Sequence, residues 1–159
     1  MRFGIMDMQL GPLIPPHLNP ADLPAHIVNF DHAALARDLH SRGFDPIELG
    51  GDLVLFMPHT FAPPAIERLA ALKAETGLTY TVHLPLWSSE PSTLLEPVRR
   101  GSVQATVDCI RATLPLEPEV YVFHATGALA AEFYRMRLPE LARQVILRQF
   151  QARAQASLA

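Results

Sequence analysis

Two short segments, TYTVHLPLW at residues 79–87 and EVYVFHATG at residues 119–127, decide the fold of this chain. Each contains a run rich in β-branched and aromatic residues, a composition typical of a β-strand. A longer amphipathic stretch follows each run, and this alternation is the pattern of βα units. The sequence therefore predicts strands over Thr79–Leu84 and Val120–His124, each with a histidine at or near its C-terminal end.

Two more βα units precede these segments. The predicted strands are Arg2–Met8 and Pro46–Leu49, and the Pro-rich stretch Gly11–Pro24 is expected to lack regular structure, since proline removes an amide donor and fixes φ. Helices are predicted in all four units from their caps and apolar stripes. The signals are an N-cap at Asp31 with Gly43 after the helix, Pro63 and Pro64 before a helix that stops at Gly77, a stripe of Val103, Val107, Ile110 and Leu114, and a last helical stretch that breaks or restarts near Pro139.

Four units of this kind predict an α/β fold, the first half of a TIM-type (β/α) barrel, as one domain over residues 1–159. A four-stranded parallel half-barrel would leave apolar faces and open strand edges exposed. Three arrangements would resolve this problem. A second half follows in a longer chain, two copies associate, or the sheet opens into a flat doubly wound arrangement.

The composition is that of an ordinary soluble domain, with 49% hydrophobic and 18% charged residues. A formal charge of -3 argues against a protein that binds nucleic acid or anionic membrane through bulk charge. Neither a signal peptide nor a membrane span is evident, and the single cysteine, Cys109, excludes an intrachain disulfide. We expect a cytoplasmic protein.

His83 and His124 are the leading candidates for chemistry. The active site of an α/β barrel is built at the C-terminal ends of its strands. Two imidazoles delivered by adjacent strands at that end can share one metal ion, although both could instead be satisfied by loop backbone. The other histidines are expected to be surface or capping residues: His17, His26, His32, His40 and His59.

Carboxylates are also needed, because two neutral imidazoles leave a metal with too many open positions. Glu48, in PIELGGD, is the candidate catalytic acid or base, and Asp52 is a candidate substrate-binding residue. A carboxylate between Ile47 and Leu49 must be paired or functional, and an arginine or loop amides could satisfy Glu48 instead. Asp7 is a weaker candidate of the same kind.

Trp87 is predicted to bind substrate as part of an apolar wall with Phe61, although core or loop packing explains both equally well. No GxSxG motif occurs, and Cys109 falls inside a predicted helix, so nucleophilic catalysis is not supported. Base and metal chemistry remain.

The segments MRFGIMD, FDPIELGG, TYTVHLPLW and VYVFHATG together resemble the xylose isomerase-like TIM barrels, also called AP endonuclease family 2. That group includes sugar phosphate isomerases and epimerases and endonuclease IV. The resemblance extends over essentially the whole chain. More narrowly, IELGGD and HLPLW are similar to segments of the cobamide-remodelling phosphodiesterases of that superfamily.

The resemblance implies a divalent metal ion, zinc, manganese or magnesium, at the C-terminal mouth of the barrel. It places metal ligands at His83 and His124, whereas the family's further ligands are expected beyond Ala159. The implied function is that of a metal-dependent sugar phosphate isomerase or epimerase with a small sugar-like or phosphorylated substrate. The alternatives are a metal-dependent phosphodiesterase, and an inactive half-barrel that needs a second copy or a complementary half. DNA repair is disfavoured by the acidic charge balance.

Overall fold

Four parallel strands form a single sheet in the computed structural model, which describes residues 1–8 and 13–159, apart from the side chains of residues 127, 129 and 130. The strand order is β1-β2-β3-β4, so each strand lies beside the next one in the sequence. This order and the helices between the strands are those of a partial TIM barrel, which confirms the predicted fold class. The strands are β1 (Ile5–Met6), β2 (Ile47–Gly50), β3 (Tyr80–His83) and β4 (Tyr121–Val122).

The two faces of the sheet differ in burial. Ile47, Leu49, Tyr80 and Val82 are completely buried, and the Tyr80 hydroxyl donates to the Leu69 carbonyl of helix α4 (Pro63–Thr76) at 3.0 Å. Because successive side chains of a strand point to opposite faces, the residues between them belong to the other face. That second face, which we call the inner face, is only half-buried.

The outer strands are shorter than predicted. Arg2–Met8 was expected as one strand, but only Ile5–Met6 pairs with β2, through register partners Ile47 and Glu48. The fourth strand likewise contains Tyr121–Val122 rather than Val120–His124. Each of these strands has a sheet neighbour on one side only, and short edge strands are common where a sheet ends.

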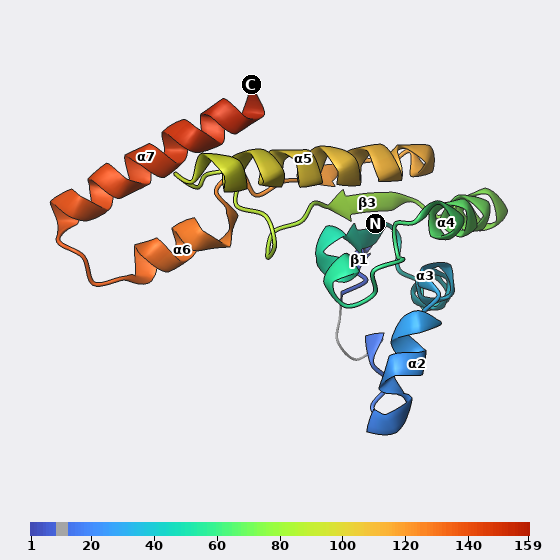
Figure 1. Ribbon diagram of the computed structural model, residues 1–159. Coiled ribbons are helices and arrows are strands. Elements are labelled where there is room, and N and C mark those ends of the chain that lie inside the picture. The colour runs from blue at the N-terminus through green and yellow to red at the C-terminus, as the bar shows by residue number, and fades with distance from the viewer. Residues whose placement is uncertain (9–12) are drawn as a thin grey trace. The chain divides into compact units, whose positions relative to one another are not determined.

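The helices that cover the buried face begin and end as their caps predict. Asp31 accepts hydrogen bonds from the Ala33 and Ala34 amides at the start of α3 (His32–Ser41), and Gly77 ends α4 with a φ of 73°. Figure 1 shows α3 and α4 side by side. Their apolar stripes therefore meet one another and the sheet.

The Pro-rich segment is more regular than expected. A 3-10 helix, η1 (Pro20–Asp22), leads into α2 (Leu23–Val28). Proline breaks a helix interior but is tolerated in the first turn, where its missing amide would have no intrahelical partner. The prediction of irregular structure is therefore wrong for Pro20–Pro24, while residues 9–12 lie outside the described part of the chain.

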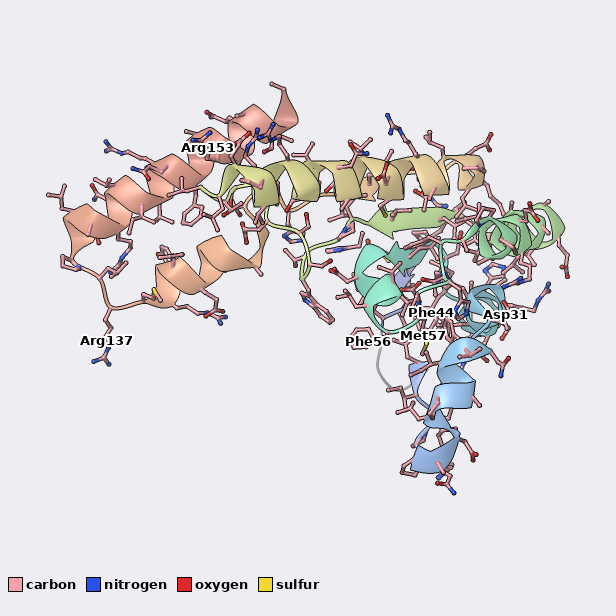
Figure 2. All side chains as sticks on the ribbon, viewed as in Figure 1. Asp31, Phe44, Phe56, Met57, Arg137 and Arg153 are labelled. Carbon is pink, nitrogen blue, oxygen red and sulfur yellow. The ribbon has the colours of Figure 1, made fainter. Side chains whose placement is uncertain are left out.

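The chain divides into two compact units, which are described separately. The first contains residues 1–83 and 109–122 and holds the whole sheet; the second contains residues 84–108 and 123–159. In the second unit, α6 (Gly127–Arg135) packs against α7 (Glu140–Leu158), and the helix restarts after Pro139 as predicted. Figure 2 shows Arg137, an exposed residue of the turn between these helices, pointing away from both. The remaining elements are α5 (Glu96–Thr113), η2 (Gly51–Leu55) and η3 (Leu114–Leu116).

Among the described residues, no helix is long and apolar enough to span a membrane.

Candidate functional site at the mouth of β2 and β3

Glu48 lies on the inner face of the sheet, in register with Thr81 of the neighbouring strand. The Thr81 hydroxyl donates to the Glu48 carboxylate at 3.4 Å, a long contact that leaves most of the acceptor capacity of the carboxylate unused within this pair. Both side chains border a hollow of about 380 Å³ on this face. The other residues that line the hollow are Gly4, Ile5, Met6, Pro46, Val120 and Val122.

His83 is the last residue of β3, at the C-terminal end where sequence analysis placed it. It lies two residues after Thr81, so strand alternation puts both on the inner face. Its register partners are Gly50 of β2 and Val122 of β4. The structure thus brings Glu48 and His83 to the same face of the sheet, with Glu48 two register positions before the C-terminal end that His83 occupies.

The Met8 side chain packs closely over Gly50, the register partner of His83. A Cβ atom at Gly50 would lie 2.3 Å from the Met8 sulfur and 2.4 Å from Met8 Cγ. These distances are shorter than any non-bonded contact allows. A side chain at position 50 would therefore require the flexible Met8 side chain to move.

His124 follows β4 by two residues and belongs to the second unit, whereas His83 belongs to the first. The pairing of these two histidines at one metal ion therefore stays a prediction. Within the described ranges, no group of three His, Cys, Asp or Glu residues is placed to hold a metal ion.

The two predicted substrate-binding residues have different environments. Asp52, in η2 directly after β2, is buried with 4% of its surface exposed. Trp87 belongs to the second unit and is 61% exposed. Their roles in substrate binding stay predictions. Figure 2 labels Phe56 and Met57, which directly follow the η2 segment that contains Asp52.

A buried pair, Asp7 and His32, is the main feature that sequence analysis missed. Both side chains are at most 1% exposed, and His32 Nε2 is hydrogen-bonded to Asp7 Oδ2. The other carboxylate oxygen accepts the Gly50 amide at 2.9 Å. The expectation of a surface or capping role for His32 is therefore wrong, since this residue links the start of α3 to the ends of β1 and β2.

The second ring nitrogen of His32 faces a backbone carbonyl. Nδ1 lies 3.4 Å from the Thr60 oxygen, and a carbonyl oxygen can only accept a hydrogen bond. Nε2 likewise faces an oxygen, that of the Asp7 carboxylate. The rings of Phe30 and Phe61 flank the imidazole at centroid distances of 6.1 Å and 5.8 Å, which places Phe61 in packing against His32.

A signal for this pair was present in the sequence. His32, Leu35, Ala36 and Leu39 share the buried stripe of α3 at helical spacing. A histidine in phase with an apolar stripe, together with an aspartate at the end of the preceding strand, favours a buried pair.

Cys109 is poorly suited to act as a nucleophile. Burial, together with the negative charge of Asp52, raises the pKa of its thiol to about 11. The thiolate is the nucleophilic form, and it is scarce at neutral pH when the pKa is this high. The structure agrees with the interpretation of Cys109 as a small hydrophobic residue.

Comparison with known proteins supports the fold. No protein-family model and no curated protein sequence matches the chain. Among solved structures, it is similar to a D-tagatose 3-epimerase-like protein, with a TM-score of 0.65 and 20% sequence identity. The alignment covers 99% of this chain and 46% of that protein, so the chain spans about half the length of its structural neighbour. At this identity the likeness establishes the partial TIM barrel alone.

Proposed function

We propose that this chain provides half of the active-site mouth of a metal-dependent enzyme of the sugar isomerase and epimerase type. The observation that supports the proposal is the position of Glu48, Thr81 and His83 on the inner face of the sheet, where Glu48 and Thr81 border the hollow. In α/β barrels the C-terminal ends of the strands carry the catalytic residues. The likeness to a D-tagatose 3-epimerase-like protein points to the same class of substrate, a small ketose.

Glu48 is the residue proposed to move the proton. Isomerisation or epimerisation next to a carbonyl needs a base that removes a carbon-bound proton and an acid that returns one. Glu48 borders the hollow, and the Thr81 hydroxyl donates to its carboxylate over the long distance of 3.4 Å. A carboxylate placed in this way can exchange a proton with a bound substrate, and the Thr81 hydroxyl helps to fix its orientation.

The proposed metal ligands of this chain are His83 and His124, with zinc, manganese or magnesium as the ion. When bound, such an ion would polarise a substrate carbonyl or hydroxyl. The described residues supply no three-ligand group, so the remaining ligands must come from outside them. Asp52 and Trp87 are proposed to contact the substrate. Phosphodiester cleavage, the alternative chemistry, uses the same two histidines.

The test is turnover of D-tagatose and related ketoses in the presence of Mn²⁺, Mg²⁺ or Zn²⁺, followed by chromatography of the sugars. We expect an epimer or isomer to form when a complementary half or a second copy supplies the remaining metal ligands. Glu48→Gln removes the base while keeping its shape, and loss of the proton-transfer group should lower turnover by a factor of about 10² to 10⁴. A matched control is Glu67→Gln, which makes the same change at an exposed position of α4.

A phosphodiester substrate assayed in parallel separates the two chemistries. Cleavage of that substrate without change in any ketose would replace the proposal with the phosphodiesterase alternative. Equal turnover by Glu48→Gln and Glu67→Gln would remove Glu48 from the chemistry.

A further inference from the structure

The side chain of Asp7 takes the place of the backbone in the sheet just after β1 ends. The Ile5 amide donates to the Pro46 carbonyl at 3.1 Å, and the Asp7 amide donates to the Glu48 carbonyl at 2.9 Å. If this parallel ladder continued regularly, the Gly50 amide would donate to the backbone carbonyl of Asp7. It donates instead to Asp7 Oδ1, at 2.9 Å. The sheet therefore gains its next hydrogen bond from a side chain.

Asp7 holds β2 at two points, the carbonyl of Glu48 and the amide of Gly50, with Leu49 between them. A strand fixed at both points cannot rotate about its own axis without losing one of these bonds. Leu49 is completely buried on one face of the sheet, and strand alternation directs Glu48 to the inner face. The two bonds from Asp7 therefore keep Glu48 turned toward the hollow that it borders.

Gly50 is the residue of β2 that the Asp7 carboxylate restrains directly. On the other side of β2, the Ile47 amide donates to the Thr79 carbonyl at 3.0 Å, whereas the Gly50 amide faces Asp7. Glycine has the least restricted backbone of all residues, so hydrogen bonding must supply the restraint that a side chain cannot. His83, the register partner of Gly50, ends β3 at this level. Order at Gly50 therefore bears on the end of the sheet that carries both Glu48 and His83.

The position of the Asp7 carboxylate is fixed in turn by His32. Asp7 is completely buried, His32 is 1% exposed, and His32 Nε2 is hydrogen-bonded to the second carboxylate oxygen. His32 Nδ1 lies 3.4 Å from the Thr60 carbonyl oxygen, and two phenylalanine rings flank the imidazole. Each carboxylate oxygen has a partner of its own. The side chain of Asp7 therefore cannot turn away from Gly50 without also leaving His32.

We propose that Asp7 is a positioning residue of the candidate site, which fixes Glu48 through the backbone of β2, and that His32 braces Asp7 in this role. The proposal rests on the proposed function, in which the Glu48 carboxylate moves a proton. Misplacement of a reacting group by about 1 Å can lower a rate by about 10²-fold, so a residue that fixes its position matters. Asp7 is completely buried, so it acts through Glu48 and not on a substrate.

The first experiment is nuclear magnetic resonance of protein labelled at the glutamate carboxyl carbons, in buffer with EDTA and without substrate. Glu48→Gln identifies the Glu48 signal by its disappearance, and exchange of the Gly50 amide in D₂O reports the bond to Asp7. Asp7→Ala should speed exchange at Gly50 at least about tenfold relative to other amides of the sheet, and it should shift the Glu48 signal. Asp7→Asn should preserve both, because its amide oxygen still accepts the Gly50 amide. The control, Asp38→Ala, breaks an exposed pair with Arg42 and should alter neither.

Asp7→Glu serves if Asp7→Ala fails to fold. It keeps a carboxylate for His32 and Gly50 but carries it one methylene further from the backbone, which usually costs less stability than the loss of a buried partner. The Glu48 signal should shift in this variant as well. An unmoved Glu48 signal in a folded variant whose Gly50 amide exchanges faster would overturn the proposal, since Asp7 would then serve the fold alone. Equal shifts in Asp7→Asn and Asp7→Ala would also overturn it.

Turnover of a ketose provides the second readout and separates this proposal from the proposed function. Asp7→Ala should lower kcat at least about tenfold with a smaller change in KM, and Asp7→Asn should restore most of the loss. A raised KM with an unaltered kcat would overturn the positioning role, because the position of the proton-transfer group bears on kcat. Absence of turnover in every variant, together with a Glu48 signal that follows Asp7 as expected, would overturn the proposed function and support the positioning of Glu48 by Asp7.

Discussion

The polar residues of the first unit have two kinds of environment. Glu48 and His83 lie on the inner face, where Glu48 borders a hollow, while Asp7 and His32 are buried and hydrogen-bonded to each other. The first kind is suited to contact with a ligand. The second kind holds the ends of β1 and β2 in place, since the Asp7 carboxylate also accepts the Gly50 amide.

At the residue scale, loss of the Asp7 carboxylate should be costly. Asp7→Ala leaves His32 and the Gly50 amide without a buried acceptor, and removal of one partner of a buried pair typically destabilises a protein by about 3–5 kcal/mol. The control is Asp38→Ala, which breaks the exposed pair with Arg42 and should cost less than about 1 kcal/mol. Urea unfolding measures both. Similar losses for the two variants would mean that the buried pair adds little.

The sequence allowed one of these two environments to be predicted. A carboxylate within an apolar strand and a histidine at a strand end are visible as exceptions to a simple pattern, and Glu48 and His83 were found in this way. Whether Asp7 and His32 meet depends on how α3 packs against β1. Twenty-five residues separate the two partners, and no local rule specifies that contact.

At the element scale, the ends of the helices were the most predictable features. N-caps and C-terminal glycines act within one turn, so Asp31 and Gly77 could be assigned from a few neighbouring residues. The strand ends were less predictable, because the length of a strand depends on its partner. The outer strands have one partner each, and their pairing stops after two residues.

Gly77, at the end of α4, and Gly101, inside α5, test the assigned helix boundaries. Gly77 has a φ of 73°, which an alanine adopts only with strain, so Gly77→Ala should destabilise the protein by about 1 kcal/mol. Gly101 lies inside α5, and a methyl group there would meet no atom within 4 Å, so Gly101→Ala should stabilise by about 0.5–1 kcal/mol. Thermal unfolding of both variants should show shifts of opposite sign. Shifts of the same sign would contradict the assigned C-cap.

Glu96 joins α5 to α7 within the second unit. Its carboxylate contacts Arg99 at 2.8 Å and Arg153 of α7 at 3.6 Å, and the hydrogen bond from Arg99 is the main reason that the pKa of Glu96 falls to about 2. A carboxyl group with a lowered folded-state pKa stabilises the protein above its unfolded-state pKa. That stabilisation is lost as the pH falls from about 4.5 to about 2.

The acid sensitivity of this contact can be isolated by substitution. The difference in urea midpoint between the unchanged protein and Glu96→Gln should shrink as the pH is lowered through this range. The other carboxyl groups are the same in both proteins, so the comparison cancels their contributions. A difference that is constant with pH would show that the Glu96 charge does not stabilise the unit.

At the scale of the whole molecule, the repeated βα pattern predicted the half-barrel correctly. Connections between parallel strands are nearly always right-handed, which limits the possible orders of strands in the sheet. The observed order β1-β2-β3-β4 is the simplest of these. The division into two compact units was not predicted, because hydrophobic periodicity reports local structure and not which distant segments pack together. Whether His83 and His124 approach one another depends on how the two units pack together, so their shared metal site stays a prediction.

The central claim is that the inner face with Glu48 and His83 moves a carbon-bound proton of a sugar. Its most direct measurement is proton nuclear magnetic resonance of D-tagatose incubated with the protein and Mg²⁺ in D₂O. We expect gradual loss of the signal of a proton next to the carbonyl, as deuterium from solvent replaces it, and retention of that signal with Glu48→Gln. An undiminished signal for every ketose and metal tested, with the protein folded, would contradict the claim.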